Sequence, residues 1–156
     1  MVRYNGNRKK GKTLLASNWF FWAILSAVFA AFTAIFAKVG LEGVDSDYAT
    51  LIRTVFILII LAAFLTYTNK WSDPTEISPR TWLFLLLSGL ATGASWVCYF
   101  RALKIGDASQ VAPVDKLSVV LVAIFAVCFL GERPSFKDWM GIFMIGGGVL
   151  LLVLKR

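Results

Sequence analysis

DASQVAPVDKLS, residues 107–118, opens an apolar segment that continues to Leu130. Asp115 and Lys116 therefore lie a little over one helical turn inside a segment that we expect to span a membrane. A charged side chain at the middle of a bilayer costs about 3 kcal/mol. Two adjacent charges of opposite sign, just past Pro113, need protein or water around them, and this need directs the interpretation of the rest of the chain.

The composition of the chain is that of a membrane protein. Of its 156 residues, 58% are hydrophobic and 16% are charged, against about 25% charged in globular proteins. So much apolar sequence leaves little polar surface for water, and we expect the lipid bilayer as a partner. The net charge is +7, and five basic residues stand in the first dozen positions: Arg3, Arg8, Lys9, Lys10 and Lys12.

Residues 1–18 are expected to form a basic, disordered, cytoplasmic tail. Anionic lipid and membrane topology explain such a tail. Nucleic acid is not an expected partner, because its binding sites need aromatic side chains free to stack on bases. Most aromatic residues of this chain lie inside the apolar segments instead.

Five apolar segments predict an all-α, polytopic membrane protein with five transmembrane helices. The expected spans cover about residues 19–38, 49–68, 81–100, 109–130 and 135–154, in a single transmembrane domain over 19–156. About 20 apolar residues are enough to cross about 30 Å of hydrocarbon. The first apolar run has 19 residues, more than the roughly 7–15 of a signal-peptide core, so we expect this helix to be retained.

Small residues mark the helix faces where close packing is expected. Gly89 and Gly93 form a GxxxG pair in the third span, and Gly146, Gly147 and Gly148 follow one another in the fifth. Glycines inside membrane helices let a neighbouring backbone approach closely. Just before the fifth span, the four residues from 135 to 138 have the Ser-x-x-Asp spacing of a capping box.

The positive charges predict the orientation. With the N-terminus in the cytoplasm, nine Lys and Arg residues face that side and five face the other, as the positive-inside rule requires. Without the tail the balance is four against five, which leaves an antiparallel arrangement of two copies open. An odd number of spans would make two such copies an inverted pair, the architecture of many transporters.

Charged and aromatic groups are expected to gather at the end of the bundle away from the tail. Arg53 lies roughly 7 Å into the second span and Asp115 roughly 9 Å into the fourth, at 1.5 Å per residue. Their equal depth predicts an ion pair between helices. Either this pair is structural, or it is functional, in that Asp115 exchanges a proton or Arg53 and Lys116 contact substrate. Trp96 and Tyr99 are aromatic-belt residues or substrate contacts at the same end.

Four further residues have two interpretations each. Lys38 and Arg101 are expected as interfacial anchors, Lys38 by snorkelling, and they complete a mostly cationic vestibule. Pro113 is either a first-turn proline, where its missing N–H costs little, or a hinge. Glu132 is either interfacial or part of a gate.

The residue types argue against an enzyme. The chain has no His, and Cys98 and Cys128 both stand within apolar segments without metal-ligand spacing. Catalysis at this depth would need a paired acid and base or a set of metal ligands. We therefore expect no metal, no cofactor and no enzymatic activity.

Several segments together resemble the EamA family of the drug/metabolite transporter superfamily. They are SGLATG (88–93), CYFRAL (98–103), APVDKLS (112–118), LGE (130–132) and the glycine-rich last helix. The resemblance covers residues 19–154 and implies alternating-access transport of small metabolites. The usual member of the family carries two inverted five-helix repeats, whereas this chain is similar to the short bacterial and archaeal members with one EamA-type repeat.

A single repeat implies that the chain works with a partner. The resemblance points to a homodimer, parallel or antiparallel, or to a related five-helix chain, in the cytoplasmic (inner) membrane of a bacterium or archaeon. The expected function is transport of a small metabolite or exported compound. The alternative is a non-transporting membrane subunit that packs against a partner membrane protein through its glycine faces.

Overall fold

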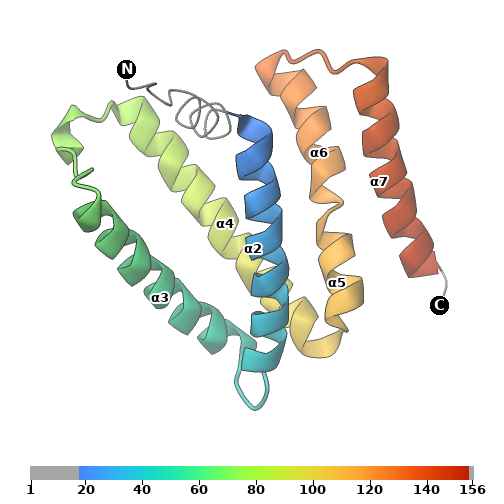
Figure 1. The fold of residues 1–156 in the computed structure, drawn as a ribbon, viewed down its shortest axis with the longest axis horizontal. Coiled ribbons are helices and arrows are strands. Elements are labelled where there is room, and N and C mark those ends of the chain that lie inside the picture. Colours follow the sequence, from blue (N-terminus) through green and yellow to red (C-terminus); the bar gives the residue numbers. More distant parts are fainter. Residues whose placement is uncertain (1–17, 155–156) are drawn as a thin grey trace, which may run out of the picture. The chain divides into compact units, whose positions relative to one another are not determined.

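The computed structural model describes residues 18–154, which consist of helices and their connections (Figure 1). Five stretches of these residues are long and apolar enough to cross a membrane. The predicted all-α, five-span fold is therefore confirmed. The basic tail predicted at residues 1–18 lies outside the described residues, except for Asn18, and so do Lys155 and Arg156.

The ends of the helices lie within five residues of the predicted ends. In chain order the helices are α2 (Trp19–Gly40), α3 (Ser46–Tyr67), the short 3-10 helix η1 (Pro74–Glu76), α4 (Pro79–Ile105), α5 (Ala108–Asp115), α6 (Ser118–Phe125), the π-helical turn η2 (Ala126–Leu130) and α7 (Phe136–Leu154).

The internal contacts divide the chain into two compact units, one ending at Phe36 and the other beginning at Ala37. In the first unit, the start of α2 carries aromatic rings that pack on their sequence neighbours. The Trp19 and Phe20 rings meet edge to face with 5.8 Å between their centres. The second unit holds the end of α2 and all the other helices, and everything described below lies within it.

Side-chain caps decide where three of the helices begin. Asp45 accepts hydrogen bonds from two backbone N–H groups in the first turn of α3, so this helix begins at Ser46 and not near residue 49. Ser78 caps α4. Before α7, the Ser135 N–H donates to Oδ2 of Asp138 over 2.7 Å and the Asp138 N–H donates to Oγ of Ser135 over 3.3 Å. The predicted capping box is confirmed.

The third span, α4, continues to Ile105, whereas the sequence predicted that it ends at residue 100 and that a loop follows. The last carbonyls of a helix have no partner within the helix. Here Lys38 supplies one, since its Nζ lies 2.7 Å from the carbonyl oxygen of Leu103 and 2.8 Å from that of Gly106. Lys38 is therefore a cap on another helix, not the snorkelling anchor that was predicted.

A second lysine returns the same interaction. Nζ of Lys104, near the end of α4, donates to the carbonyl oxygens of Leu41 and Val44, each over 2.7 Å. Two lysines thus join the turn after α2 to the link after α4. Lys38 donates from α2 to the end of α4, and Lys104 donates from α4 to the turn after α2. We call the residues 38–47 and 101–107 the braced end.

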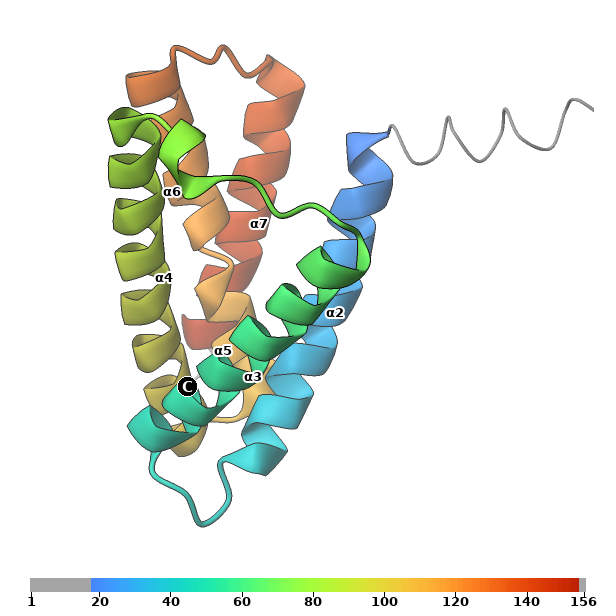
Figure 2. The same cartoon turned by 90° about the vertical axis from the view of Figure 1, so that its left-hand side faces the viewer.

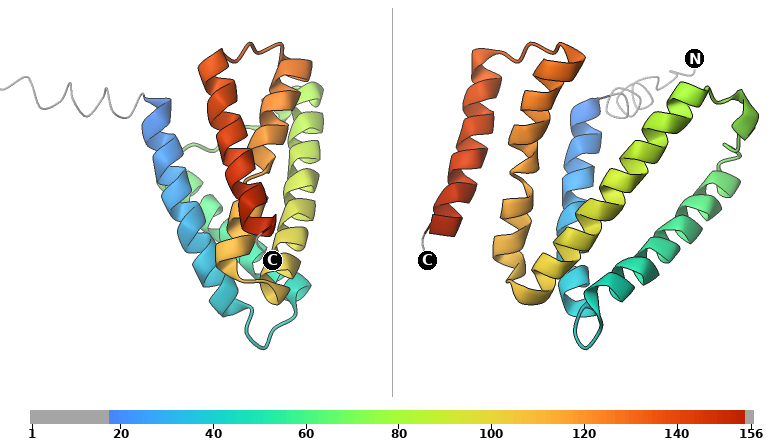
Figure 3. Two further views of the ribbon diagram at one scale, coloured as in Figure 1. Left: turned by 90° about the vertical axis from the view of Figure 1, so that its right-hand side faces the viewer. Right: turned by 180° about the vertical axis from the view of Figure 1, so that it is seen from behind.

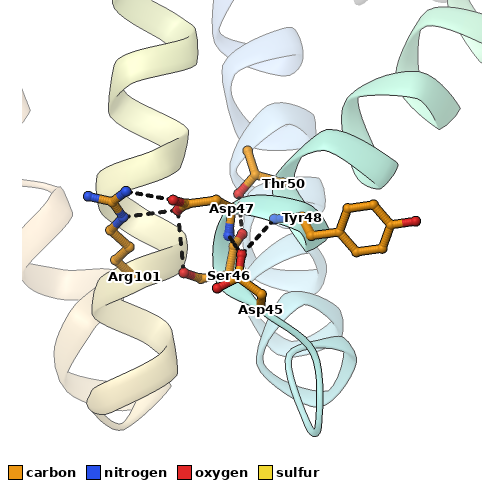
Figure 4. A network of polar contacts seen from close by, with 6 residues as sticks. All are labelled: Asp45, Ser46, Asp47, Tyr48, Thr50 and Arg101. Atoms are coloured by element: carbon orange, nitrogen blue, oxygen red, sulfur yellow. Dashed lines mark hydrogen bonds and ion pairs between the residues drawn. The ribbon is translucent and has the colours of Figure 1, made fainter.

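An ion pair also joins α3 to α4 at the braced end (Figure 4). Nε of Arg101 lies 2.9 Å from Oδ1 of Asp47, and Nη2 lies 2.6 Å from Oδ2. Both side chains stay about half exposed, at 62% for Arg101 and 48% for Asp47. Arg101, which was predicted to be an interfacial anchor, is engaged with a carboxylate instead.

The buried core of this unit is small and lies beside the braced end. Leu41, Phe100 and Leu103 are buried, and Tyr99 and Val111 pack against them. Most large apolar side chains along α3, α4, α6 and α7 are exposed on the chain. In a bilayer, lipid or another membrane chain covers such faces.

The predicted fourth span is broken near its middle, at Lys116 and Leu117 between α5 and α6 (Figure 2). The hydrogen bonds tighten there from an i+4 to an i+3 pattern: the Lys116 N–H donates to Pro113 and the Val119 N–H donates to Lys116. Pro113 lies in the second turn of α5, not the first as predicted. Because proline has no N–H and its ring crowds the preceding turn, it weakens the helix just before the break.

The fourth span then ends in the wider turn η2, where the Glu132 N–H donates to the carbonyl of Ala126 over 3.2 Å. Gly131 closes this turn with a φ of 68°, a conformation that favours glycine. From there α7 returns alongside α6 and α5 (Figure 3). This return brings the end of α7 back toward α5.

Candidate functional site

A cavity of about 480 Å³ is lined by residues of α4, α5 and the end of α7. Its polar lining residues are Ser95, Cys98, Tyr99, Gln110 and Asp115. Apolar side chains complete the wall, namely Ala102, Val111, Val114, Leu152 and Val153. The cavity thus combines an apolar wall with a few polar groups and one carboxylate, as ligand sites in proteins commonly do.

Helical periodicity places these side chains together. On α4, Ser95, Tyr99 and Ala102 recur at intervals of four and three residues, which is one face of a helix. On α5, Val111 and Asp115 are four residues apart, so they also share a face. The two faces meet because α4 packs on α5.

Asp115 is the charged residue among the described residues that line the cavity. Its Oδ2 lies 3.0 Å from Nζ of Lys116, the neighbouring residue, at the break between α5 and α6. The Lys116 side chain is 54% exposed and does not line the cavity. Of these two residues, Asp115 lines the cavity and Lys116 pairs with it from outside the lining.

Arg53 does not pair with Asp115, and that prediction was wrong. Its guanidinium carbon lies 4.1 Å from the centre of the Trp96 ring and 5.1 Å from that of Phe100. Equal depth in the membrane says nothing about rotation around the helix axis. Because α3 packs on α4, Arg53 reaches the aromatic rings of α4, whose faces attract cations.

The five charged and aromatic candidates therefore fall into two groups. Asp115 and Tyr99 line the cavity with Lys116 adjacent, whereas Arg53 and Trp96 form a cation–π contact between α3 and α4. The roles assigned to these residues in binding or coupling stay predictions.

The predicted packing glycines differ in their surroundings. A Cβ atom added at Gly146 would come within 3.1 Å of Val120 on α6. At Gly89, Gly93, Gly147 and Gly148 an added Cβ would meet nothing within 4 Å among the described residues. These four glycines are therefore open positions among the described residues.

The predicted hinge and gate residues lie at irregular points of the fourth span. Pro113 precedes the break between α5 and α6, and Glu132 is exposed immediately after η2. Their roles as hinge and gate stay predictions. Sequence reasoning missed Ser95 and Gln110, which both line the cavity. Their spacing from Tyr99 and Val114, four residues in each case, was the available signal.

Five membrane-spanning stretches, with a carboxylate in a cavity between α4, α5 and α7, define a multi-pass membrane protein with an intramembrane polar site. Residues 17–154 match the EamA-like transporter family, and the chain belongs to that family. The family resemblance predicted from the sequence is thereby confirmed, and the chain is a membrane transporter by family. No solved structure matches the chain.

Relatives of two lengths match the chain. It is 60% identical over 140 residues to an "uncharacterized transporter in cobO 3'region" of a Sinorhizobium species, covering 90% of this chain and 99% of the relative. It is 26% identical over 151 residues to the "uncharacterized transporter YxxF" of Bacillus subtilis, covering 96% of this chain but 47% of the relative. The chain thus spans the full length of the first relative and about half of the second.

A third relative is named as part of an assembly. The chain is 39% identical over 87 residues to a "probable 4-amino-4-deoxy-L-arabinose-phosphoundecaprenol flippase subunit ArnF" of Sodalis glossinidius. The match covers 54% of this chain and 65% of that relative.

Proposed function

We propose that the chain moves a small metabolite or exported compound across the membrane by alternating access, and that the cavity holding Asp115 is its substrate site. The observation that carries this proposal is the carboxylate in a mainly apolar cavity beside a broken helix. An ionisable group at this depth is costly unless water or a ligand reaches it. A volume of about 480 Å³ lies within the roughly 300–1,000 Å³ of small-molecule sites.

The broken fourth span supports the proposed movement. Irregular backbone within a membrane is tolerated where it borders a cavity, and transporters commonly place interrupted helices at their substrate sites. Here the break at Lys116 and Leu117 follows directly on Asp115. A change of angle at the break would move α6 relative to α5 and Asp115, while the braced end keeps the end of α2, α3 and α4 joined.

The proposed active form is a dimer. Relatives such as the Bacillus subtilis protein are about twice as long as this chain, and a second copy would supply the missing half. The exposed apolar faces and the open glycines of α4 and α7 leave room for it. We place the dimer in the inner membrane with the N-terminus in the cytoplasm. Reporter fusions at the C-terminus test this orientation. Reporter signal on both sides of the membrane would indicate antiparallel copies.

A thermal-shift screen against a metabolite library tests the transport proposal. A true ligand stabilises the state that binds it, so the unfolding temperature should rise with its concentration. Ser95→Trp, which fills the cavity, should abolish the shift, and the same compound should show counterflow in proteoliposomes. Retention of the shift in Ser95→Trp would place binding elsewhere and contradict the assignment of the cavity.

The second candidate function is a non-transporting subunit of a larger membrane assembly. The relative named as a probable flippase subunit favours it, because such a chain acts through a partner. A purified chain that stays monomeric, binds no solute and drives no counterflow, yet copurifies with one membrane protein, would support this candidate over the first.

A further inference from the structure

The basic residues at this end of the bundle are already engaged. Lys38 donates to two carbonyls, Arg101 binds a carboxylate, and Arg53 lies on aromatic rings. Lys104 donates to the turn after α2. The group of cations that the sequence places here is thus used for structure, and none of these four residues lines the cavity.

The charge within the cavity is the opposite one. Among the described lining residues, the charged group is the carboxylate of Asp115. We propose that the cavity takes a small organic cation with an apolar body, and that its cationic group binds Asp115 in place of the Lys116 ammonium. This inference rests on the proposed transport function and names its substrate class.

In this proposal, the Lys116 ammonium binds the Asp115 carboxylate while no ligand is present. Its Nζ lies 3.0 Å from Asp115, as the cationic group of a bound amine would. The pair is partly exposed, at 54% for Lys116 and 36% for Asp115, and exposed pairs of this kind are weak. A ligand cation therefore displaces Lys116 at little cost and gains contacts that the lysine does not make.

Those further contacts come from the remaining walls. Tyr99 presents an aromatic ring, which attracts a cation through its face. Val111, Val114 and Leu152 offer apolar surface to the body of the ligand. Ser95 and Gln110 supply hydrogen-bonding groups to the same cavity. An anion of the same size would meet the Asp115 carboxylate directly.

The test compares two probes of similar size and opposite charge, benzyltrimethylammonium and phenylmethanesulfonate, by calorimetric titration of the purified full chain in detergent. The cation is expected to bind and the anion is not. Lys116→Gln should bind the cation about two- to fivefold more tightly, because the competing pair is worth that much at an exposed site. Asp115→Asn should lose binding of the cation.

Two more variants keep the test decisive. Gln110→Glu adds a second carboxylate to the lining and should tighten binding of the cation even if Asp115→Asn fails to fold. Glu76→Gln, a charge change in the exposed 3-10 helix η1, is the control and should leave binding unchanged. Preference for the anion, failure of the cation to bind, or equal affinity for the cation in wild type, Lys116→Gln and Gln110→Glu would each overturn the proposal.

The failure of this inference is distinguishable from failure of the transport proposal. If a library screen yields an anion or a neutral compound whose binding is lost in Ser95→Trp, the cavity remains the substrate site and the assignment of a cation is wrong. If no compound of any charge binds or is transported, both proposals fall.

Discussion

Nζ of Lys38 donates a hydrogen bond of 2.7 Å to the carbonyl oxygen of Leu103, 65 residues further along the chain. The bond satisfies a carbonyl at the end of α4, where no helical N–H is available. Together with the return bond from Lys104, it makes the braced end a fixed point of the second unit. The part of the unit that is free to move is therefore expected to lie beyond it, at the break between α5 and α6.

Replacing Lys38 by Met should destabilise the chain. Two carbonyls at the end of α4 lose their donor, and an unsatisfied polar group costs about 1–3 kcal/mol. Thermal unfolding in detergent micelles measures the loss, with Lys70→Met in the exposed connector after α3 as the control. Equal melting temperatures for the two variants would show that Lys38 does not brace the helices.

The ion pair between Asp47 and Arg101 should contribute much less. Because both side chains are about half exposed, we expect a coupling free energy of up to about 1 kcal/mol in a double-mutant cycle. The exchanged variant, Asp47→Arg with Arg101→Asp, should recover part of the loss seen in each single variant. A coupling several times larger would indicate that the braced end excludes water.

The contact between Arg53 and Trp96 should stabilise the folded chain without contributing to ligand binding in the cavity. Arg53→Met and Trp96→Leu should show a coupling of about 0.5–2 kcal/mol in unfolding experiments, the range for cation–π contacts. Binding of a cavity ligand should change little in either variant, since neither residue lines the cavity. Loss of binding in Arg53→Met with normal stability would assign Arg53 to the site.

Pro113→Ala should strengthen the helix next to the break. The new N–H restores a backbone donor in α5, and removing an interior proline relieves up to about 3 kcal/mol of helix distortion. We expect a higher melting temperature together with slower counterflow at unchanged ligand affinity. Faster or unchanged counterflow would argue that the break does not act as the hinge.

The two sets of glycines should respond differently to the same substitution. Gly146→Leu should lower the melting temperature, because an added Cβ already lies 3.1 Å from Val120. A Cβ added at Gly93 meets nothing within 4 Å among the described residues, so the Gly93→Leu chain should fold. If crosslinking then shows weaker self-association, Gly93 lies at the dimer contact. A folding defect in Gly93→Leu would show close packing within the chain.

The sequence predicted those features that depend on local patterns. Span number and position follow from apolar runs of the length that crosses a bilayer, and the Ser135–Asp138 box follows from residue spacing. The end of α4 was placed too early because the donor that satisfies its last carbonyls, Lys38, is distant in sequence. Such a partner is visible only when the helices are placed side by side.

The candidate site was predicted in part for a related reason. Depth along a helix is readable from the sequence, and it directed attention to Asp115, Arg53 and Tyr99. Rotation around the helix axis decides which of these side chains face one another, and it separates Arg53 from Asp115. Counting basic residues likewise suggested a cationic vestibule, whereas each of those cations is held by a neighbouring group.

The most direct test of a water-accessible, negatively charged chamber uses the two native cysteines. Cys98 lines the cavity, whereas Cys128 lies in η2 and does not. In membranes, a chain with Cys128→Ala should react with a cationic water-soluble methanethiosulfonate, and more slowly with its anionic counterpart. A chain with Cys98→Ala should react slowly with both. If Cys98 is no more reactive than Cys128, or prefers the anionic reagent, water and cations do not reach Asp115 and the account is contradicted.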